Sequence, residues 1–483
     1  MVRFGLVLNR TALILLAIAP FMLTAIPFSL YYRANDIPTI LASFGITVVA
    51  ALAMYGLTPK GGEVTHREGI CIVTLGWILT AGFGALPFYI YGTFPTYTDA
   101  YFEAMSGFTT TGASVLAEIE AQPAGILFWR SLTHWLGGMG IVVLSLAVLP
   151  ALGAGGMQLY RAEVPGPSAD KLVPRLQETA KRLYVVYTII SAAEVLLLLL
   201  GGMNLFDSLT HMFGTMGTGG FSPKSASVGH YKSVYVDLVI SAFMLIAGAN
   251  FLLHYNAMAK RDYRGYVKDE EFRFYTGVVG FFSLTVALNL VLQNVYAAFP
   301  QALRHAFFSV VSIITTTGFA TEDFAKWPTY GHYVLLILMF VGGCAGSTGG
   351  AIKCVRVWLL LKIAYGQIFR IIHPKAVRTL RYNGRIVPPE VVQGVQSMFA
   401  LYMLTFVAAS VALAWLGHDV LTAISAVAAT LGNVGPGLGN VGPTENYFHF
   451  SLTAKWICSF CMLVGRLEVY SVVVLFVPEF WRK

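Results

Sequence analysis

Thr109-Thr110-Thr111-Gly112-Ala113-Ser114 is the first of four related stretches in this chain of 483 residues. The others follow at intervals of roughly 100 to 120 residues and are Met216-Gly217-Thr218-Gly219-Gly220-Phe221, Thr315-Thr316-Thr317-Gly318-Phe319-Ala320 and Gly432-Asn433-Val434-Gly435-Pro436-Gly437. Apolar segments flank each stretch, and the four stretches align on Gly112, Gly219, Gly318 and Gly435. Such a recurrence at nearly fixed spacing indicates an internal fourfold repeat.

The composition is typical of a membrane protein. Hydrophobic residues make up 56% of the chain and charged residues only 12%, with a mean hydropathy of +0.68. A soluble domain of this length needs more charge to cover its surface. Apolar runs of about 20 residues, long enough to cross a bilayer, recur along the chain. The expected spans are 11–32, 38–58, 70–92, 126–150, 183–203, 233–258, 273–296, 331–361, 392–417 and 454–478.

These patterns predict an all-α integral membrane protein with four pseudo-symmetric helix–pore-loop–helix repeats around one pore, plus two additional N-terminal transmembrane helices. The first apolar run is too long for a signal peptide and lacks a small-residue cleavage site, so we expect it to remain as a helix. The expected divisions are 1–60 for the two N-terminal helices and 66–152, 175–260, 270–368 and 390–483 for the four repeats. We expect a multi-pass protein of a plasma or bacterial inner membrane.

The distribution of positive charge predicts the orientation of the chain. Lys and Arg gather in the stretches 151–182, 254–273 and 362–391. The segments 94–125 and 418–447 have neither, and 204–232 and 298–330 have two each. Cytoplasmic loops of membrane proteins carry the excess of Lys and Arg, so the repeat stretches face outward. The net positive charge of the chain is therefore explained by its cytoplasmic loops and gives little support to a nucleic-acid partner.

Each repeat glycine follows an apolar stretch that is too short to cross the membrane. Asp99, Asp207 and Asp419 precede three of these stretches and Pro300 the fourth, and both residue types are favoured at helix starts. A half-helix that enters from outside points its partly negative end at the membrane centre, which favours a cation. The extended chain after it must line a water-filled path, and its carbonyls can replace the hydration shell of an ion.

We therefore predict a cation filter in which K⁺ binds backbone carbonyls and no organic cofactor takes part. Glycine at the shared position lets the backbone adopt a positive φ and aim successive carbonyls inward. The predicted filter residues are Thr110, Thr111, Gly112, Thr218, Gly219, Thr316, Thr317, Gly318, Asn433, Val434 and Gly435.

The segment 331–361 contains a glycine cluster that predicts a break in the helix. Five glycines fall within nine residues, and each costs a helix up to about 1 kcal/mol relative to Ala. Irregular backbone at this depth must line a cavity, so we predict a pore-blocking loop that moves during gating. The alternative is close packing of helices through small residues. The predicted gate glycines are Gly342, Gly343, Gly346, Gly349 and Gly350.

Arg466 lies inside the last apolar run, where a charge costs roughly 2.5–3.5 kcal/mol. We expect it to face the pore below the filter and to act with the glycine cluster as a barrier to cations. The alternative is a structural ion pair with Glu468 or Glu194.

Two other patterns and two other functions compete with the pore. Cys458-x-x-Cys461 lies mid-helix without a second pair, which favours packing over metal binding. Gly437-Leu438-Gly439-Asn440-Val441-Gly442 matches a dinucleotide fingerprint but follows no strand, so we reject a nucleotide site there. An ion-coupled secondary transporter with broken helices remains an alternative function. We do not expect an enzyme, because no paired catalytic groups are evident.

These residues resemble the Trk/Ktr/HKT superfamily, and within it the TrkH branch of bacterial potassium uptake systems. The resemblance covers the whole chain and rests on the four glycine motifs, the glycine cluster and Gly465-Arg466-Leu467-Glu468. It implies a homodimer with one pore per subunit and a cytosolic ring of TrkA-like nucleotide-binding regulatory subunits on the basic inner loops. It also implies that the four glycines define the filter and that the glycine cluster and Arg466 restrict the pore. Members with serine at the position of Gly112 tend to admit sodium.

Overall fold

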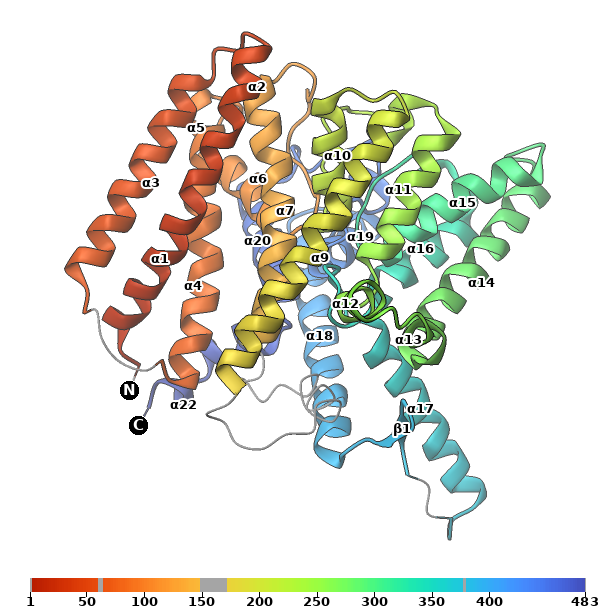
Figure 1. Cartoon of the computed structure of the whole chain (residues 1–483). Coiled ribbons are helices and arrows are strands. Elements are labelled where there is room, and N and C mark those ends of the chain that lie inside the picture. Colours follow the sequence, from red (N-terminus) through yellow and green to blue (C-terminus); the bar gives the residue numbers. More distant parts are fainter. Residues whose placement is uncertain (1, 60–63, 148–171, 377–378, 483) are drawn as a thin grey trace.

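The computed structural model describes residues 2–59, 64–147, 172–376 and 379–482, and these residues form a mostly helical molecule (Figure 1). The predicted all-α membrane fold is confirmed. Six of the described helical segments are long and apolar enough to cross a membrane, and two further segments are bent pairs of shorter helices. The one sheet among these residues is the antiparallel pair β1 (Arg381–Tyr382) and β2 (Arg385–Ile386).

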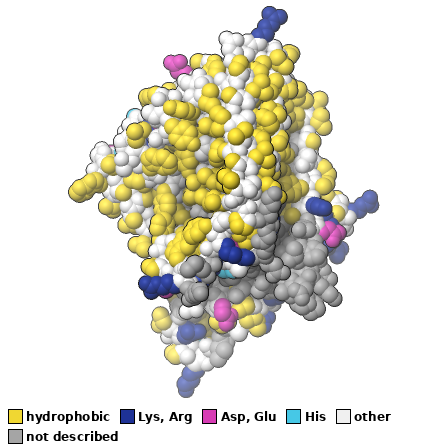
Figure 2. All heavy atoms as spheres, turned by 90° about the vertical axis from the view of Figure 1, so that its left-hand side faces the viewer, with side chains coloured by type: hydrophobic (Ala, Val, Ile, Leu, Met, Phe, Trp, Pro, Cys, Tyr) yellow, Lys and Arg dark blue, Asp and Glu magenta, His cyan; other side chains and the backbone are white. Residues whose placement is uncertain are grey.

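The six long segments belong to the outer part of the molecule. The first comprises α1 (Phe4–Met22), η1 (Leu23–Ala25) and α2 (Ile26–Tyr31), and the next are α3 (Ile37–Leu57) and the pair α4 (His66–Gly84) and α5 (Leu86–Tyr91). The others lie in α9 (Leu172–Leu200), α14 (Glu270–Leu292) and α18 (Pro389–Trp415). Figure 2 shows hydrophobic side chains over most of the height of one face, with Lys and Arg toward its two ends, as lipid contact requires.

Four half-helices form the inner part of the molecule: α6 (Tyr97–Phe108), α10 (Leu205–Gly217), α15 (Phe299–Ile314) and α19 (Val420–Leu431). Their helix starts differ from the expectation in two cases. Thr96 and Asn204 cap α6 and α10 by accepting from the amides of Asp99 and Asp207, which therefore lie inside the first turn. Asp419 does cap α19, and hydrogen bonds from Thr422 hold the pKa of its carboxyl below the usual range.

An inner helix follows each half-helix, and three of the four inner helices are interrupted. The first is α7 (Ala124–Ala147). The second bends by 98° between α11 (Val234–Ala247) and α12 (Phe251–Lys260), and the fourth by 115° between α20 (Leu452–Arg466) and the segment 470–476. The third comprises α16 (Thr329–Val341) and α17 (Cys354–Ile372), which are separated by residues 342–353. The expectation of continuous spans at 233–258 and 454–478 is therefore wrong.

The two unexpected bends have local causes. At the first bend, the side chain of Asn250 accepts from the amide of Leu252 and starts a new helix. At the second, Glu468 and Val469 adopt positive φ angles of 58° and 57°, which an α-helix cannot contain.

The repeats close into a ring because each inner helix packs on the half-helix of the next repeat. The packed pairs are α7 with α10, α11 with α15, α16 with α19, and α20 with α6. Figure 1 shows α1 and α3 standing beside this ring next to α4, while α17 reaches beyond the other helices at the end that carries both termini. Two predictions fall largely outside the described residues. They are the end of the first repeat at residue 152 and most of the basic stretch 151–182.

The remaining elements are short. They are η3 (Ser227–Tyr231), α13 (Arg264–Lys268), η4 (Phe324–Lys326), η5 (Gly439–Val441), α21 (Tyr470–Val473), η6 (Val474–Phe476) and α22 (Pro478–Trp481).

Candidate ion-conduction site

The chain leaves each half-helix through the same backbone conformation. One residue at the helix end is left-handed, with φ of 51° at Thr110, 54° at Thr218, 60° at Thr316 and 53° at Asn433. The glycine two residues later also has a positive φ, of 81° at Gly112, 80° at Gly220, 80° at Gly318 and 99° at Gly435. An alternation of this kind turns successive carbonyls toward one side, the arrangement found in cation filters. We call these twelve residues, 110–112, 218–220, 316–318 and 433–435, the glycine ring.

The second repeat is aligned one residue too early in the sequence-based prediction. Gly220, not Gly219, has the positive φ of Gly112, Gly318 and Gly435. Gly219 takes the place of Thr111, Thr317 and Val434, whose amides each donate to the carbonyl of the residue five before them at 2.7–2.8 Å. The amide of Gly219 makes the same bond to the Gly214 carbonyl at 2.8 Å.

The four segments of the glycine ring touch one another in cyclic order. A Cβ atom on Gly112 would lie 1.9 Å from the carbonyl oxygen of Gly219, and one on Gly220 would lie 2.1 Å from that of Thr317. A Cβ atom on Gly318 would lie 2.2 Å from the Val434 carbonyl oxygen, and one on Gly435 would lie 2.6 Å from the Thr111 carbonyl oxygen of the first repeat. Each glycine thus lets a backbone carbonyl of the next repeat pack directly against its own backbone, and this contact closes the ring.

Side-chain hydroxyl groups hold the segments in place. The hydroxyls of Thr109 and Thr111 are 2.8 Å apart, as are those of Thr315 and Thr317. In the fourth repeat, Nδ2 of Asn433 donates to Oγ1 of Thr111 at 3.0 Å and so ties that repeat to the first.

A cavity of about 120 Å³ lies on the outer side of the glycine ring. Its lining includes Gly112, Gly220, Gly318 and Gly435, one glycine from each repeat, together with Glu445 and Asn446 from the loop after α19. The ring is therefore open to an outer mouth in all four repeats. Gly219 is not among the described lining residues, which agrees with the corrected alignment.

The predicted break in the 331–361 segment is present, and the resulting loop, residues 342–353, lies against the inner side of the ring. The amide of Gly350 donates to Oγ1 of Thr316 at 2.7 Å. A Cβ atom on Gly350 would approach Gly432 O and Asn433 Cβ to 2.5 and 2.8 Å, and one on Gly349 would lie 3.0 Å from Thr315 O. The loop thus contacts the helix ends of the third and fourth repeats, and at Gly350 it lies closer to the fourth repeat than a residue with a Cβ atom permits.

Three anchors hold this loop. The amide of Cys344 donates to Gly248 O at 2.8 Å, at the bend between α11 and α12. Oε1 of the buried Glu271 accepts from the amides of Ala345 and Val355 at 2.7 and 2.9 Å. Lys353 Nζ donates to the carbonyl of Gly349 within the loop itself.

Arg466 is buried at the end of α20 and binds carbonyls rather than acids. Its Nη1 donates to Thr348 O in the loop at 2.7 Å, and its Nη2 to Gly137 O on α7 at 3.0 Å. Glu468 instead pairs with Arg356, and no ion pair joins Arg466 to Glu194 within the described residues. The alternative of a structural ion pair with either acid is therefore wrong, and the guanidinium charge beneath the ring stays uncompensated by those acids.

Comparison with known proteins identifies the family. The family model TrkH, a cation transport protein, matches residues 37–483. The chain belongs to the TrkH family. The Trk system potassium uptake protein TrkH of Escherichia coli K12 is 44% identical over 427 residues, 87% of each chain. The corresponding protein of Halomonas elongata is 41% identical over 481 residues, 99% of each chain.

A solved structure of the TrkH family has the same fold. The crystal structure of the potassium transporter TrkH from Vibrio parahaemolyticus matches with a TM-score of 0.92 and 36% identity, and the match covers 99% of this chain and 100% of that chain. Together with the apolar helices, membership of the TrkH family makes this a multi-pass membrane protein.

Two buried ion pairs brace this TrkH-family site and are missing from the sequence-based prediction. Nε of Arg130 on α7 is 2.6 Å from Oε1 of Glu103 on α6. Nη1 of Arg130 donates to Ser222 O at 3.1 Å, and its guanidinium lies 3.6 Å from the centre of the Phe221 ring. This pair therefore links the first and second repeats immediately outside the ring.

The other pair links the fourth and first repeats. Nζ of Lys455 on α20 is 2.6 Å from Oδ1 of Asp99 on α6, and both side chains are buried. The signal that could have revealed these pairs is the presence of single charges within otherwise apolar segments, the same signal that identified Arg466.

Proposed function

We propose that this chain takes up potassium ions across the cytoplasmic membrane through a channel-like pore whose filter is the glycine ring. The observation that carries the proposal is the closed contact of four glycine-centred segments, each with the same alternation of φ. The printed names of the relatives, potassium uptake proteins, support potassium as the ion.

Backbone carbonyls supply the ion chemistry in this proposal. Four half-helices direct their partly negative C-terminal ends at the ring, which lowers the cost of placing a cation there. The carbonyls of residues 110–112, 218–220, 316–318 and 433–435 then replace water around the dehydrated ion. Because the glycine of each repeat packs against a carbonyl of the next, the oxygens cannot move apart independently, which favours one ion size.

The 342–353 loop and Arg466 act as the gate, and the conformation described is closed. Two contacts support this part of the proposal: the bond from the Gly350 amide to Thr316 and the bond from Arg466 to Thr348. An ion that leaves the ring toward the cytoplasm meets the loop and a buried positive charge. Opening requires the loop to release Thr316 and to move away from the ring.

The assembly follows the family resemblance. We propose a homodimer with one pore per subunit and a cytosolic TrkA-like nucleotide-binding regulatory subunit that docks on the basic inner loops. The described basic loops, which include α13 and the stretch after α17, lie in the half of the molecule that carries both termini, as a single docking side requires (Figure 1).

The test is potassium and sodium flux through the purified chain in liposomes. We expect channel-type flux that is not strictly coupled to a second ion. We also expect the flux of potassium to exceed that of sodium. An absence of cation flux under any gradient or nucleotide, with and without the regulatory subunit, would refute the proposal. Flux strictly coupled to a proton or sodium gradient would favour a secondary transporter instead.

A further inference from the structure

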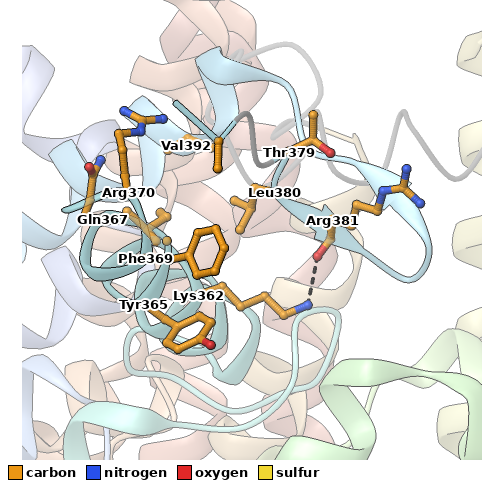
Figure 3. A pocket seen from close by; sticks show the side chains of 12 residues that line it. Lys362, Tyr365, Gln367, Phe369, Arg370, Thr379, Leu380, Arg381 and Val392 are labelled. Carbon is orange, nitrogen blue, oxygen red and sulfur yellow. Dashed lines mark hydrogen bonds between the residues drawn. The ribbon is translucent and has the colours of Figure 1, made fainter. Parts of the chain in front are cut away.

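A cavity of about 390 Å³ opens between the second half of α17, the β1–β2 pair and the start of α18. Figure 3 shows Phe369, Leu380 and Val392 between Arg370 on one side and Arg381 on the other, with Lys362 below them. We propose that this cavity binds the phosphate-bearing headgroup of an acidic phospholipid. The proposal concerns a site far from the glycine ring and does not depend on what the ring conducts.

The charge of the cavity favours a phosphate ligand. Arg370, Arg381 and Lys362 line it, and the described lining residues include no Asp or Glu. Lys362 is held by Glu270 and donates to Arg381 O at 2.8 Å. Neither guanidinium has a carboxylate partner within the described part of the chain, so both are available for the bidentate hydrogen bonds that suit phosphate.

The depth of the cavity in the membrane favours a lipid. Helix α17 has 19 residues and is therefore about 28 Å long. It starts just beneath the glycine ring, near the membrane centre, so about 15 Å of hydrocarbon separates its start from the cytoplasmic boundary. The boundary then lies about ten residues after Cys354, at the level of the residues that line the cavity.

Exposed apolar side chains of α17 lie on both sides of this boundary. Leu361, on the membrane side, is 53% exposed and can contact an acyl chain, whereas Tyr365, Ile368 and Ile372 follow at helical spacing beside the cavity, toward the cytoplasm. A basic cavity at the cytoplasmic boundary, next to an exposed apolar side chain, is the combination that binds acidic headgroups. A cavity of this volume has the size of a small-molecule site, which argues against a segment of protein as the occupant.

Occupancy of the cavity has a direct route to the 342–353 loop. Oε2 of Glu270 accepts from Nε1 of Trp358 at 3.1 Å and also binds Lys362 of the cavity. The next residue, Glu271, holds the amides of Ala345 in the loop and of Val355 at the start of α17. A lipid that fixes the far end of α17 therefore stabilises the position of the loop.

The experiment measures lipid retention and thermal stability of the full-length chain in detergent. Phosphatidylglycerol and phosphatidylcholine are added separately, and bound lipid is counted by native mass spectrometry. We expect selective retention of phosphatidylglycerol and a higher midpoint of unfolding. The variant Arg370→Gln/Arg381→Gln should lose at least tenfold in affinity, whereas Arg370→Lys/Arg381→Lys should lose less. The matched control, Arg264→Gln/Arg385→Gln, removes two exposed charges outside the cavity and should bind as the wild type does.

A second arm distinguishes the source of the phosphate. Glycerol 3-phosphate is added without lipid, and an arginine-dependent stabilisation would support a phosphate site that is filled from solution. Equal retention of phosphatidylglycerol by the double Gln variant and the wild type overturns the proposal. The proposal is also overturned if replacement of the two arginines changes only the docking of a regulatory subunit and leaves lipid retention unchanged.

Discussion

Replacement of Gly112 by serine tests the glycine ring most directly. The Cβ atom of the serine would lie 1.9 Å from the carbonyl oxygen of Gly219, and 3.1 Å from its carbon. Carbon and oxygen atoms in close contact stay about 3.3 Å apart, so the Gly219 carbonyl must move by about 1.4 Å. A binding site loses its intended geometry when ligands shift by more than about 0.5 Å. We therefore expect Gly112→Ser to reduce the preference for potassium over sodium at least tenfold, which corresponds to about 1.4 kcal/mol.

Gly92 provides the matched control. It has a φ of 84°, close to the 81° of Gly112, but a Cβ atom there meets nothing within 4 Å. Gly92→Ser therefore introduces the same backbone strain without a clash, and we expect wild-type selectivity. The assay is the permeability ratio of potassium to sodium in liposomes, measured for both variants at equal reconstitution. Wild-type selectivity and flux in Gly112→Ser would refute the idea that contact between repeats sets the filter.

Three further substitutions test the loop, the charge beneath the ring and one of its braces. Arg466→Ala should raise cation flux in liposomes about tenfold or more, since a unit charge about 8 Å from an ion contributes about 2 kcal/mol at an effective dielectric constant of 20. Thr316→Val removes the acceptor for the Gly350 amide, a bond of about 1 kcal/mol, and should increase the open fraction and the flux about fivefold. Glu103→Gln leaves the buried Arg130 without its counter-charge and should reduce the free energy of unfolding by about 3 kcal/mol, measured by denaturation in detergent.

Two of these substitutions, Thr316→Val and Glu103→Gln, have a control within the chain. Thr110 occupies the position of Thr316 in the first repeat, so Thr110→Val removes a ring hydroxyl without touching the loop bond. Glu445→Gln changes an exposed acid at the outer mouth, which Arg130 also lines, and should leave stability unchanged. Unchanged flux in a folded Arg466→Ala protein would remove that residue from the gate. An equal rise in flux in both threonine variants would assign the effect to the ring rather than the loop.

Local patterns in the sequence were sufficient for the repeat, the half-helices and the break at residues 342–353. Short apolar stretches before a glycine, and a glycine cluster within an apolar run, each restrict the backbone without reference to distant parts of the chain. The error in the second repeat has the same origin. Gly219 and Gly220 are adjacent, so the sequence allows both alignments. The positive φ of Gly220 and the bond from the Gly219 amide to Gly214 O in the folded chain decide between them.

Contacts between elements could not be predicted in the same way. Arg130 pairs with Glu103 and Lys455 with Asp99 because the ring brings α7 and α20 against α6, and a single sequence contains no information on these distances. The partners of Arg466 were missed because they are carbonyl groups, which every residue carries. A charge that is buried among carbonyls leaves no complementary residue type in the sequence.

The departures from fourfold symmetry on the inner side of the ring fit together. The ring itself repeats one conformation four times, but below it three of the inner helices are interrupted in three different ways. The 342–353 loop of the third repeat binds Gly248 at the bend of the second through Cys344, and Arg466 at the bend of the fourth through Thr348. Movement of the loop must therefore break contacts at both bends, whereas the contacts that close the ring involve neither Gly248 nor Arg466. In the proposed mechanism, this separation allows the lower part of the pore to open while the geometry of the glycine ring stays fixed.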